Sequence, residues 1–449
     1  MQSNFDAARA ALSKMGLLPV ESAVYAKIPY WRGWYEGEDR EFHHYKVYNG
    51  KRTLSRRRKS LNMAQRVCED WANLLLNEKT VVRAEEERAE KLIARVLSDN
   101  AFSVYGNRLM ELTFALGTGA FAVNVSAGKI TVDFIRADSV FPLGMRGNEI
   151  TECAFCSRLF RDGKTVLYVQ AHTCEKDGSY RIRNAFFGEG GEEMPLPDGV
   201  LPEVRSKVRL FSVVTPNVVN KVELGSPLGA SVFAGAIDNL CGCDLVFDSF
   251  CNDFQLGLKR IMIPVTMARM MTDEDGTTRP VFDENDVTFY AVPEDQKLTE
   301  TDPHLRANEH IAALREQIDL LSDRCGLGTH RFCVDSNAGV KTATEVISEN
   351  SVLYQNLEKH RKVLERALET IARAILFLGG YKAYDTCALR VDFDDSIIQD
   401  KTAQKADDRL DVSLGVMPKW EYRAKWYGET EEKARAVLAE GDGDGAAEE

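Results

Sequence analysis

Apolar residues recur at helical spacing through the first hundred residues. Residues 5–16 predict a short amphipathic helix, residues 60–76 a second helix and residues 85–97 a third. Between the first two helices lies a loop rich in aromatic and charged side chains. We expect its aromatic residues to pack against a neighbouring element, with base stacking as the less favoured interpretation: Trp31, Trp34, Tyr35, Tyr45 and Tyr48.

The pattern changes after a further helix at 102–118. Apolar and polar residues then alternate with period two, and glycines stand at the turns, so residues 120–215 predict a β-rich region of hairpins. A glycine- and proline-rich stretch, GEGGEEMPLPDGVLP, predicts a long surface loop within this region.

Two helices, at 227–257 and 303–325, flank a segment of short strands and turns at 258–302. The first helix carries apolar residues at alternating steps of four and three, with Asp244 as one acidic member, which is typical of a heptad seam. The seam residues expected to contact a neighbouring subunit are Phe233, Ile237, Leu240, Phe247 and Phe254 on the first helix and Ile311, Leu314 and Ile318 on the second.

The helix pair allows two interpretations. A single chain would cover these seams only partly, which favours copies standing side by side in a ring or barrel wall. An ordinary antiparallel pair inside one globular domain fits the periodicity equally well. The longest predicted helix follows at 343–378, and the terminal EGDGDGAAEE is polar and typical of a frayed end.

Length and composition are those of a globular protein of two to four structural units. The succession of helical and β-rich segments predicts an α+β protein. No run of about 18 uncharged apolar residues is present, and the N-terminus lacks the pattern of a secretory signal. The net charge of −12 is unusual for a protein that grips nucleic acid. Either the chain does not contact nucleic acid, or it contacts DNA that must slide past it without being held.

No catalytic residue, metal ligand set or cofactor is predicted, because the common nucleotide-binding and hydrolase motifs do not occur. Asp392, Asp394 and Asp395 could bind a cation, although a solvated strand end is favoured. Cys153 and Cys156 form a C-x-x-C on a predicted strand, where residues three apart point to opposite faces and chelate poorly. We therefore expect the ten cysteines to be structural thiols.

A basic run, Arg56-Arg57-Arg58-Lys59, precedes the helix predicted at 60–76. Because a helix N-terminus disfavours cations, this run needs an acidic partner. A nucleic-acid contact, an anionic neighbour and a solvated surface all remain open for it, and the solvated surface is favoured.

The order of these parts resembles the portal family of long-tailed phages over about residues 25–430. The similarity is carried by Trp31-x-x-Trp34-Tyr35, SLNMAQRVCEDWANLLLNE at 60–78, the helix–strands–helix insert, TATEVISENSVLYQNLEKH at 342–360 and VDFDDSIIQDKTAQKADDRLDVSLGVMPKWEYRAKWYG at 391–428. No single motif is decisive, but the collinear series is specific.

The resemblance implies a portal fold with a mixed α/β wing, a two-helix stem, a small β-containing clip and a helical crown. The implied boundaries are a wing at 1–226, stem helices at 227–257 and 303–325, a clip at 258–302, a wing return at 326–379 and a crown with the C-terminal tail at 380–449. The implied tunnel loop, at about 335–344, would present to DNA the residues Asn337, Gly339, Lys341, Thr342 and Thr344.

The resemblance also implies a ring, typically of twelve subunits, at one capsid vertex of the virion, assembled in the host bacterial cytoplasm. The ring would be the channel for DNA packaging and ejection, with weak, non-specific contact to double-stranded DNA. Its other implied partners are the terminase large subunit, the major capsid and scaffolding proteins and the head–tail connector, with no membrane. The alternatives are a metal-dependent nucleic-acid enzyme using the Asp392 cluster and a cytoplasmic coiled-coil adaptor.

Overall fold

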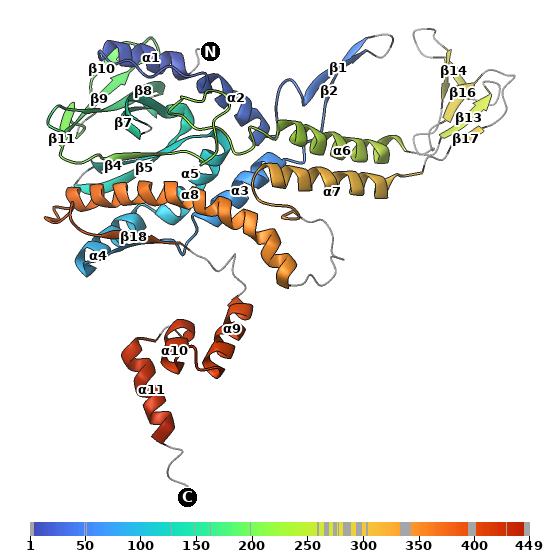
Figure 1. The fold of residues 1–449 in the computed structure, drawn as a ribbon. Coiled ribbons are helices and arrows are strands. Elements are labelled where there is room, and N and C mark those ends of the chain that lie inside the picture. The colour runs from blue at the N-terminus through green and yellow to red at the C-terminus, as the bar shows by residue number, and fades with distance from the viewer. Residues whose placement is uncertain are drawn as a thin grey trace, which may run out of the picture. The chain divides into compact units, whose positions relative to one another are not determined.

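The computed structural model describes residues 4–443 except 49, 51, 127, 148, 162, 198, 258–259, 265–268, 273–275, 277, 282–288, 293–298, 302–303, 333–342, 394–400 and 428 (Figure 1). Helices form 44% and strands 24% of the structure, which confirms the α+β class. The chain divides into two compact units, Met1–Val391 and Asp392–Glu449.

The N-terminal part of the first unit is mainly helical, as predicted, but the loop predicted between its first two helices is wrong. Trp31, Trp34 and Tyr35 lie on a further helix there, and Tyr45 and Tyr48 lie on a strand of a two-stranded hairpin. This hairpin lies between the second and third helices and is described below. The elements are α1 (Asn4–Lys14), α2 (Val24–Tyr35), β1 (His44–Tyr48), β2 (Thr53–Arg57), α3 (Met63–Leu75), β3 (Val81–Ala84), α4 (Glu87–Asp99) and α5 (Phe102–Leu116).

Antiparallel sheets fill the region predicted to be β-rich. The larger sheet has the order β10-β9-β8-β7-β6, with β11 also on β9, and the smaller has the order β12-β4-β5. The strands are β4 (Gly119–Ser126), β5 (Lys129–Arg136), β6 (Val140–Arg146), β7 (Glu149–Arg161), β8 (Lys164–Cys174), β9 (Tyr180–Phe187), β10 (Glu193–Met194), β11 (Glu203–Ser206) and β12 (Phe211–Val214), and the short 3-10 turn η1 (Ala137–Ser139) precedes β6.

Strand β7 supplies the core on both faces of the larger sheet. Cys156 belongs to a cluster that includes Leu12 of α1, whereas Cys153 belongs to a cluster that includes Phe211 of β12. The two thiols therefore point to opposite faces, as predicted from strand geometry. Burial raises the pKa of both thiols above the ordinary cysteine value, which fits an inert packing role.

The longest helix, α8 (Ala343–Leu378), agrees with the predicted 343–378. It packs against β4 and β12 and against α3 and α4, so it joins the smaller sheet to the N-terminal helices (Figure 1). Its buried apolar residues recur at helical spacing: Leu353, Leu357, Leu364, Leu368, Ile371 and Ile375.

Helices α6 (Ile237–Leu256) and α7 (Ala307–Arg324) run antiparallel beside each other (Figure 1). The segment between them contains short strands, as predicted: β13 pairs with β16 in parallel and with β17 antiparallel, and β14 pairs with β15. The strands are β13 (Arg260–Pro264), β14 (Arg269–Thr272), β15 (Thr278–Val281), β16 (Phe289–Val292) and β17 (Thr299–Thr301).

The prediction that the first helix of this pair begins at residue 227 is wrong, because residues 227–236 form turns and α6 begins at Ile237. The turn segment is fastened to the end of α5, where Val232 N donates to Phe114 O at 2.9 Å. At Gly229 an added Cβ would lie 2.2 Å from Gly117 O. This close backbone approach requires glycine and replaces helical hydrogen bonds with tertiary ones.

The boundary predicted at residue 380 is also displaced. Strand β18 (Leu389–Asp392) pairs with β3 and closes the first unit, so the second unit begins at Asp392. The second unit contains α9 (Lys401–Ser413), α10 (Lys419–Tyr427) and α11 (Glu431–Gly443). Inside it, Asp408 accepts from Trp426 Nε1 at 2.7 Å and pairs with Lys425.

Among the helices of the described residues, none has the length and apolar character that a membrane crossing requires.

His360 connects α8 to the helical core. Its ring lies 4.7 Å from that of Trp71 and 5.1 Å from that of Phe114, both edge-on. Its Nδ1 accepts a hydrogen bond from Asn217 N at 3.0 Å. Burial lowers the pKa of His360 to about 4, and burial also lowers the pKa of His172 to about 3.

Acid should therefore destabilise the fold before its carboxylates protonate. Between pH about 6.5 and 4 the unfolded chain binds more protons than the folded chain, so the free energy of unfolding falls as the pH falls. We expect each of the two histidines to contribute a loss of about 2 kcal/mol between pH 7 and pH 5. His360→Gln keeps an acceptor for Asn217 and should flatten this slope in urea unfolding. An unchanged slope would contradict the assignment.

Candidate subunit-contact site on helices α6 and α7

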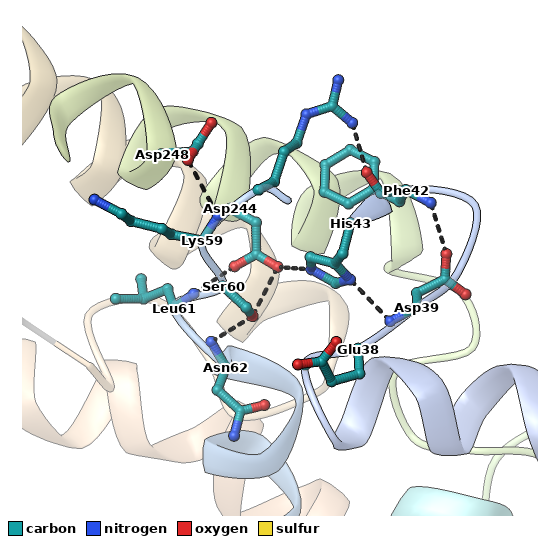
Figure 2. Close-up of polar contacts among 12 residues, drawn as sticks. Glu38, Asp39, Phe42, His43, Lys59, Ser60, Leu61, Asn62, Asp244 and Asp248 are labelled. Carbon is teal, nitrogen blue, oxygen red and sulfur yellow. Dashed lines mark hydrogen bonds and ion pairs between the residues drawn. The ribbon is translucent and has the colours of Figure 1, made fainter. Parts of the chain in front are cut away.

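Helix α6 is held by the segment that leads into and out of the β1–β2 hairpin (Figure 2). Asp244, the acidic member of the predicted seam, is only 3% exposed. Its Oδ2 accepts hydrogen bonds from His43 Nε2 and Ser60 Oγ, both at 2.9 Å, and its Oδ1 accepts from Leu61 N at 2.7 Å. Three donors thus compensate the burial of one carboxylate.

The tautomer of His43 follows from its partners. Asp39 N is 2.9 Å from His43 Nδ1, and a backbone amide can only donate, so Nδ1 is the acceptor. Nε2 then carries the hydrogen and donates it to Asp244. The fully buried ring therefore has both nitrogens satisfied and fixes the turn 39–43 against α6.

A second carboxylate, one turn further along α6, repeats this contact. Asp248 Oδ1 accepts from Lys59 N at 3.1 Å, and Oδ2 accepts from Asn252 Nδ2 at 3.1 Å. We call the contacts of Asp244 and Asp248 with residues 43 and 59–61 the α6 clasp. The clasp lies within one chain, so Asp244, a member of the predicted seam, makes these contacts inside the subunit.

The far end of α6 is tied to the start of α7. Asp253 makes a bidentate pair with Arg306 and accepts from His310 Nε2 at 2.9 Å. Hydrogen bonds from Arg306 and His310 hold the pKa of Asp253 below its ordinary value. At Gly242 an added Cβ would lie 2.4 Å from Gln317 Oε1, so the two helices approach closely there.

The other predicted seam residues divide by burial within the single chain. Phe233 is fully buried but precedes α6, so it belongs to the turn segment and not to the helix. Leu240 and Ile318 are buried, whereas Phe254 is 51% exposed. The remaining four are half-buried: Ile237, Phe247, Ile311 and Leu314. Contact of the incompletely covered residues with a second subunit stays a prediction.

The chain after α7 is anchored just before residues 333–342. Trp71 Nε1 donates to Cys325 O at 3.1 Å, and Asn356 Nδ2 donates to Gly326 O at 2.9 Å. Arg331 forms a bidentate pair with the buried Asp70 at 2.7 and 3.0 Å. These contacts fix the point from which the predicted tunnel loop departs.

The predicted loop residues themselves are outside the described part of the chain. This applies to Asn337, Gly339, Lys341 and Thr342, while Thr344 falls in the first turn of α8 and its side chain is not described. Asp394 and Asp395 of the alternative metal cluster also lie outside. Among the residues that the structure describes, no group of three or more histidine, cysteine or acidic side chains could hold a metal ion.

The clasp was not predicted, although one signal pointed to it. A single aspartate in an otherwise apolar seam needs buried donors, because an uncompensated carboxylate is too costly to bury. His43 and Ser60 precede Asp244 by 201 and 184 residues, so no local pattern identifies them as those donors.

The antiparallel helices α6 and α7, with short strands between them in the chain, project from the α+β body of the first unit (Figure 1). The family model described as phage portal protein, SPP1 Gp6-like, matches residues 21–443. Because the match spans most of the 449 residues, the chain belongs to this family. No curated protein shows a significant match to the chain.

Membership in this family makes the chain a phage portal protein, a structural component of the virion capsid. The enzyme and adaptor alternatives are not favoured. The family is structural and not enzymatic.

Asp244 provides a direct test of the clasp. Asp244→Ala leaves the donors of His43, Ser60 and Leu61 without an acceptor, and we expect the free energy of unfolding to fall by about 3–5 kcal/mol. Asp238→Ala, at an exposed position of the same helix, is the matched control and should cost less than about 1 kcal/mol. Equal urea midpoints for the two variants would show that the clasp does not stabilise α6.

Proposed function

We propose that this chain is the subunit of a closed ring, of twelve copies, at one vertex of the phage capsid. The ring is the channel for DNA packaging and ejection and the docking site for the terminase motor and the head–tail connector. The supporting observation is the family match over residues 21–443, which includes the α6–α7 pair and the strands between its helices.

In this proposal each part of the fold has a role. Helices α6 and α7 form the stem, and β13 to β17 form the clip that faces the motor and later the connector. The N-terminal helices, the two larger sheets and α8 form the wing, which contacts capsid and scaffolding proteins. Helices α9 to α11 form a small crown, and residues 335–344 form the tunnel loop.

The stem assignment is supported by how the two helices are held. Asp253 joins them at the end nearest the clip, and the clasp fixes α6 to the body at the other end. Phe247, which is half-buried, lies on α6 between Asp244 and Asp253. Phe254, which is 51% exposed, follows Asp253. A rigid pair with incompletely covered apolar residues is suited to side-by-side packing in a ring.

The charge of the chain supports a conduit that does not hold its DNA. Each neutralised phosphate adds affinity, so a surface rich in cations would stall a moving duplex. A net charge of −12 per subunit keeps contact with double-stranded DNA weak and non-specific. The energy for movement comes from the terminase large subunit, and assembly takes place in the host cytoplasm before the ring enters the virion.

Ring formation is the first test of the proposal. The purified protein should form closed rings with a central hole, without added nucleotide, because the incompletely covered stem residues are buried when copies pack side by side. Native mass spectrometry should give a multiple near twelve, and negative-stain images should show the hole. Only monomers and dimers at high protein concentration and moderate salt would contradict the proposal.

The tunnel loop is tested by Lys341→Ala. Lys341 is the only cation in residues 335–344, so twelve copies would place one ring of positive charge against passing phosphates. The variant should assemble normally but change DNA packaging or retention. Free DNA should bind the isolated wild-type ring no more tightly than about micromolar at physiological salt.

Nanomolar, sequence-selective binding would contradict this view of the channel. A ring structure with Lys341 far from the axis would remove the loop assignment only, and the portal assignment would stand.

A further inference from the structure

The β1–β2 hairpin stands apart from the rest of the first unit (Figure 1). Its strands pair from His44 opposite Arg57 to Tyr48 opposite Thr53, and no third strand joins them in the described part of the chain. Val47 is 41% and Tyr48 is 68% exposed. A lone two-stranded hairpin is only marginally stable in water, so this one needs a surface to pack on.

The base of the hairpin is nevertheless rigidly held. The clasp fixes residues on both sides of it to α6, as Figure 2 shows. The Arg58 guanidinium lies 4.6 Å from the ring centroids of both Phe42 and Tyr45 and donates to Phe42 O at 2.7 Å. Both sides of the hairpin base are therefore fixed to α6.

The hairpin is strongly basic. Residues 44–59 contain seven lysines and arginines and no acidic residue. One of the seven, Arg57, pairs with Glu38 at the base. Lys46 and Arg56 are exposed, and the register places Arg56 on the same face as Val47 and Leu54. The hairpin thus offers cations beside apolar side chains.

A surface of the opposite character lies on α7. Residues at steps of four, three, four and three are all exposed along one side of this helix, and three of the five are acidic. Leu320, 45% exposed, is the large apolar member. We call this surface the acidic stripe; it consists of Glu309, Ala313, Glu316, Leu320 and Asp323.

We propose that the β1–β2 hairpin of one copy docks on the acidic stripe of the next copy. This inference rests on the proposed ring. In Figure 1 the hairpin rises from one side of α6 and α7 lies on the other, so the hairpin is directed away from its own stripe. A contact between two different surfaces, repeated from copy to copy, is the head-to-tail type that closes rings.

Charge and apolar character together favour a protein partner over DNA. Three of the five exposed residues of the acidic stripe are acidic and none is basic, so the hairpin meets a negative surface there. Val47 and Leu54, which share one face of the hairpin, gain little from a phosphate backbone, whereas Leu320 and Ala313 can cover them. If the hairpin binds DNA and not the stripe, this proposal is wrong.

A cysteine pair tests the contact in the otherwise native chain. Val47→Cys on the apolar face of the hairpin, combined with Ala313→Cys on the stripe, should give covalent dimers and longer ladders on mild oxidation, resolved on a non-reducing gel. Each single variant is the control for the native cysteines, of which Cys174 is exposed. A ladder no stronger than in the single variants overturns the proposal, whether or not rings close.

Charge exchange tests the chemistry of the contact. Lys46→Glu with Arg56→Glu should raise the protein concentration needed for rings by about ten-fold or more, since the hairpin then repels the acidic stripe. Adding Glu309→Lys and Glu316→Lys should restore assembly to within about three-fold of the wild type. Lys129→Glu with Lys164→Glu, at exposed positions elsewhere, makes the same charge change and should have no effect.

The outcomes separate this inference from the proposed function. Absence of rings in the wild type is a failure of the proposed function, and the cysteine pair still reports on the contact between copies. Wild-type rings with normal assembly of the hairpin variant overturn the inference alone. Normal assembly with loss of DNA retention by that variant assigns the hairpin to phosphate binding instead.

Discussion

The buried carboxylate of Asp244 is the constraint on which the arrangement of the projecting helices depends. It is compensated by donors from His43, Ser60 and Leu61, which flank the β1–β2 hairpin. Because an unpaired carboxylate could not remain buried there, α6 and the hairpin must be positioned together. The same contact therefore fixes the direction of the helix pair and presents a basic hairpin beside it.

Local patterns predicted most of the elements but not every boundary. The helical period identified α8 over 343–378, and alternation identified the sheets between β4 and β12. The start of α6 was misplaced because residues 227–236 have suitable side chains for a helix, while their backbone is held by contacts with α5 and Gly117. The pairing of β18 with β3, which moved the boundary from residue 380, joins segments some 300 residues apart. Neither of these tertiary contacts leaves a periodic signal.

The sequence predicted the helix pair but not the clasp that holds α6. The apolar seam and its one aspartate were visible in the sequence, and so was the basic run at 56–59. Interpreting that run as the approach to a helix hid the hairpin, because β2 includes Arg56 and Arg57 and α3 begins only at Met63. The topology of the fold determines which distant polar groups come into contact, and local sequence patterns do not reveal those contacts.

The spacing of the three aspartates along α6 also determines how the helix would carry a mechanical load. Asp253 follows Asp244 by nine residues, or about 14 Å of helix, and Asp248 lies between them. Each makes at least one contact outside α6, with residues 43 and 59–61 or with Arg306 and His310. A force along the helix axis would load these contacts together and in shear. The force would therefore be divided among them.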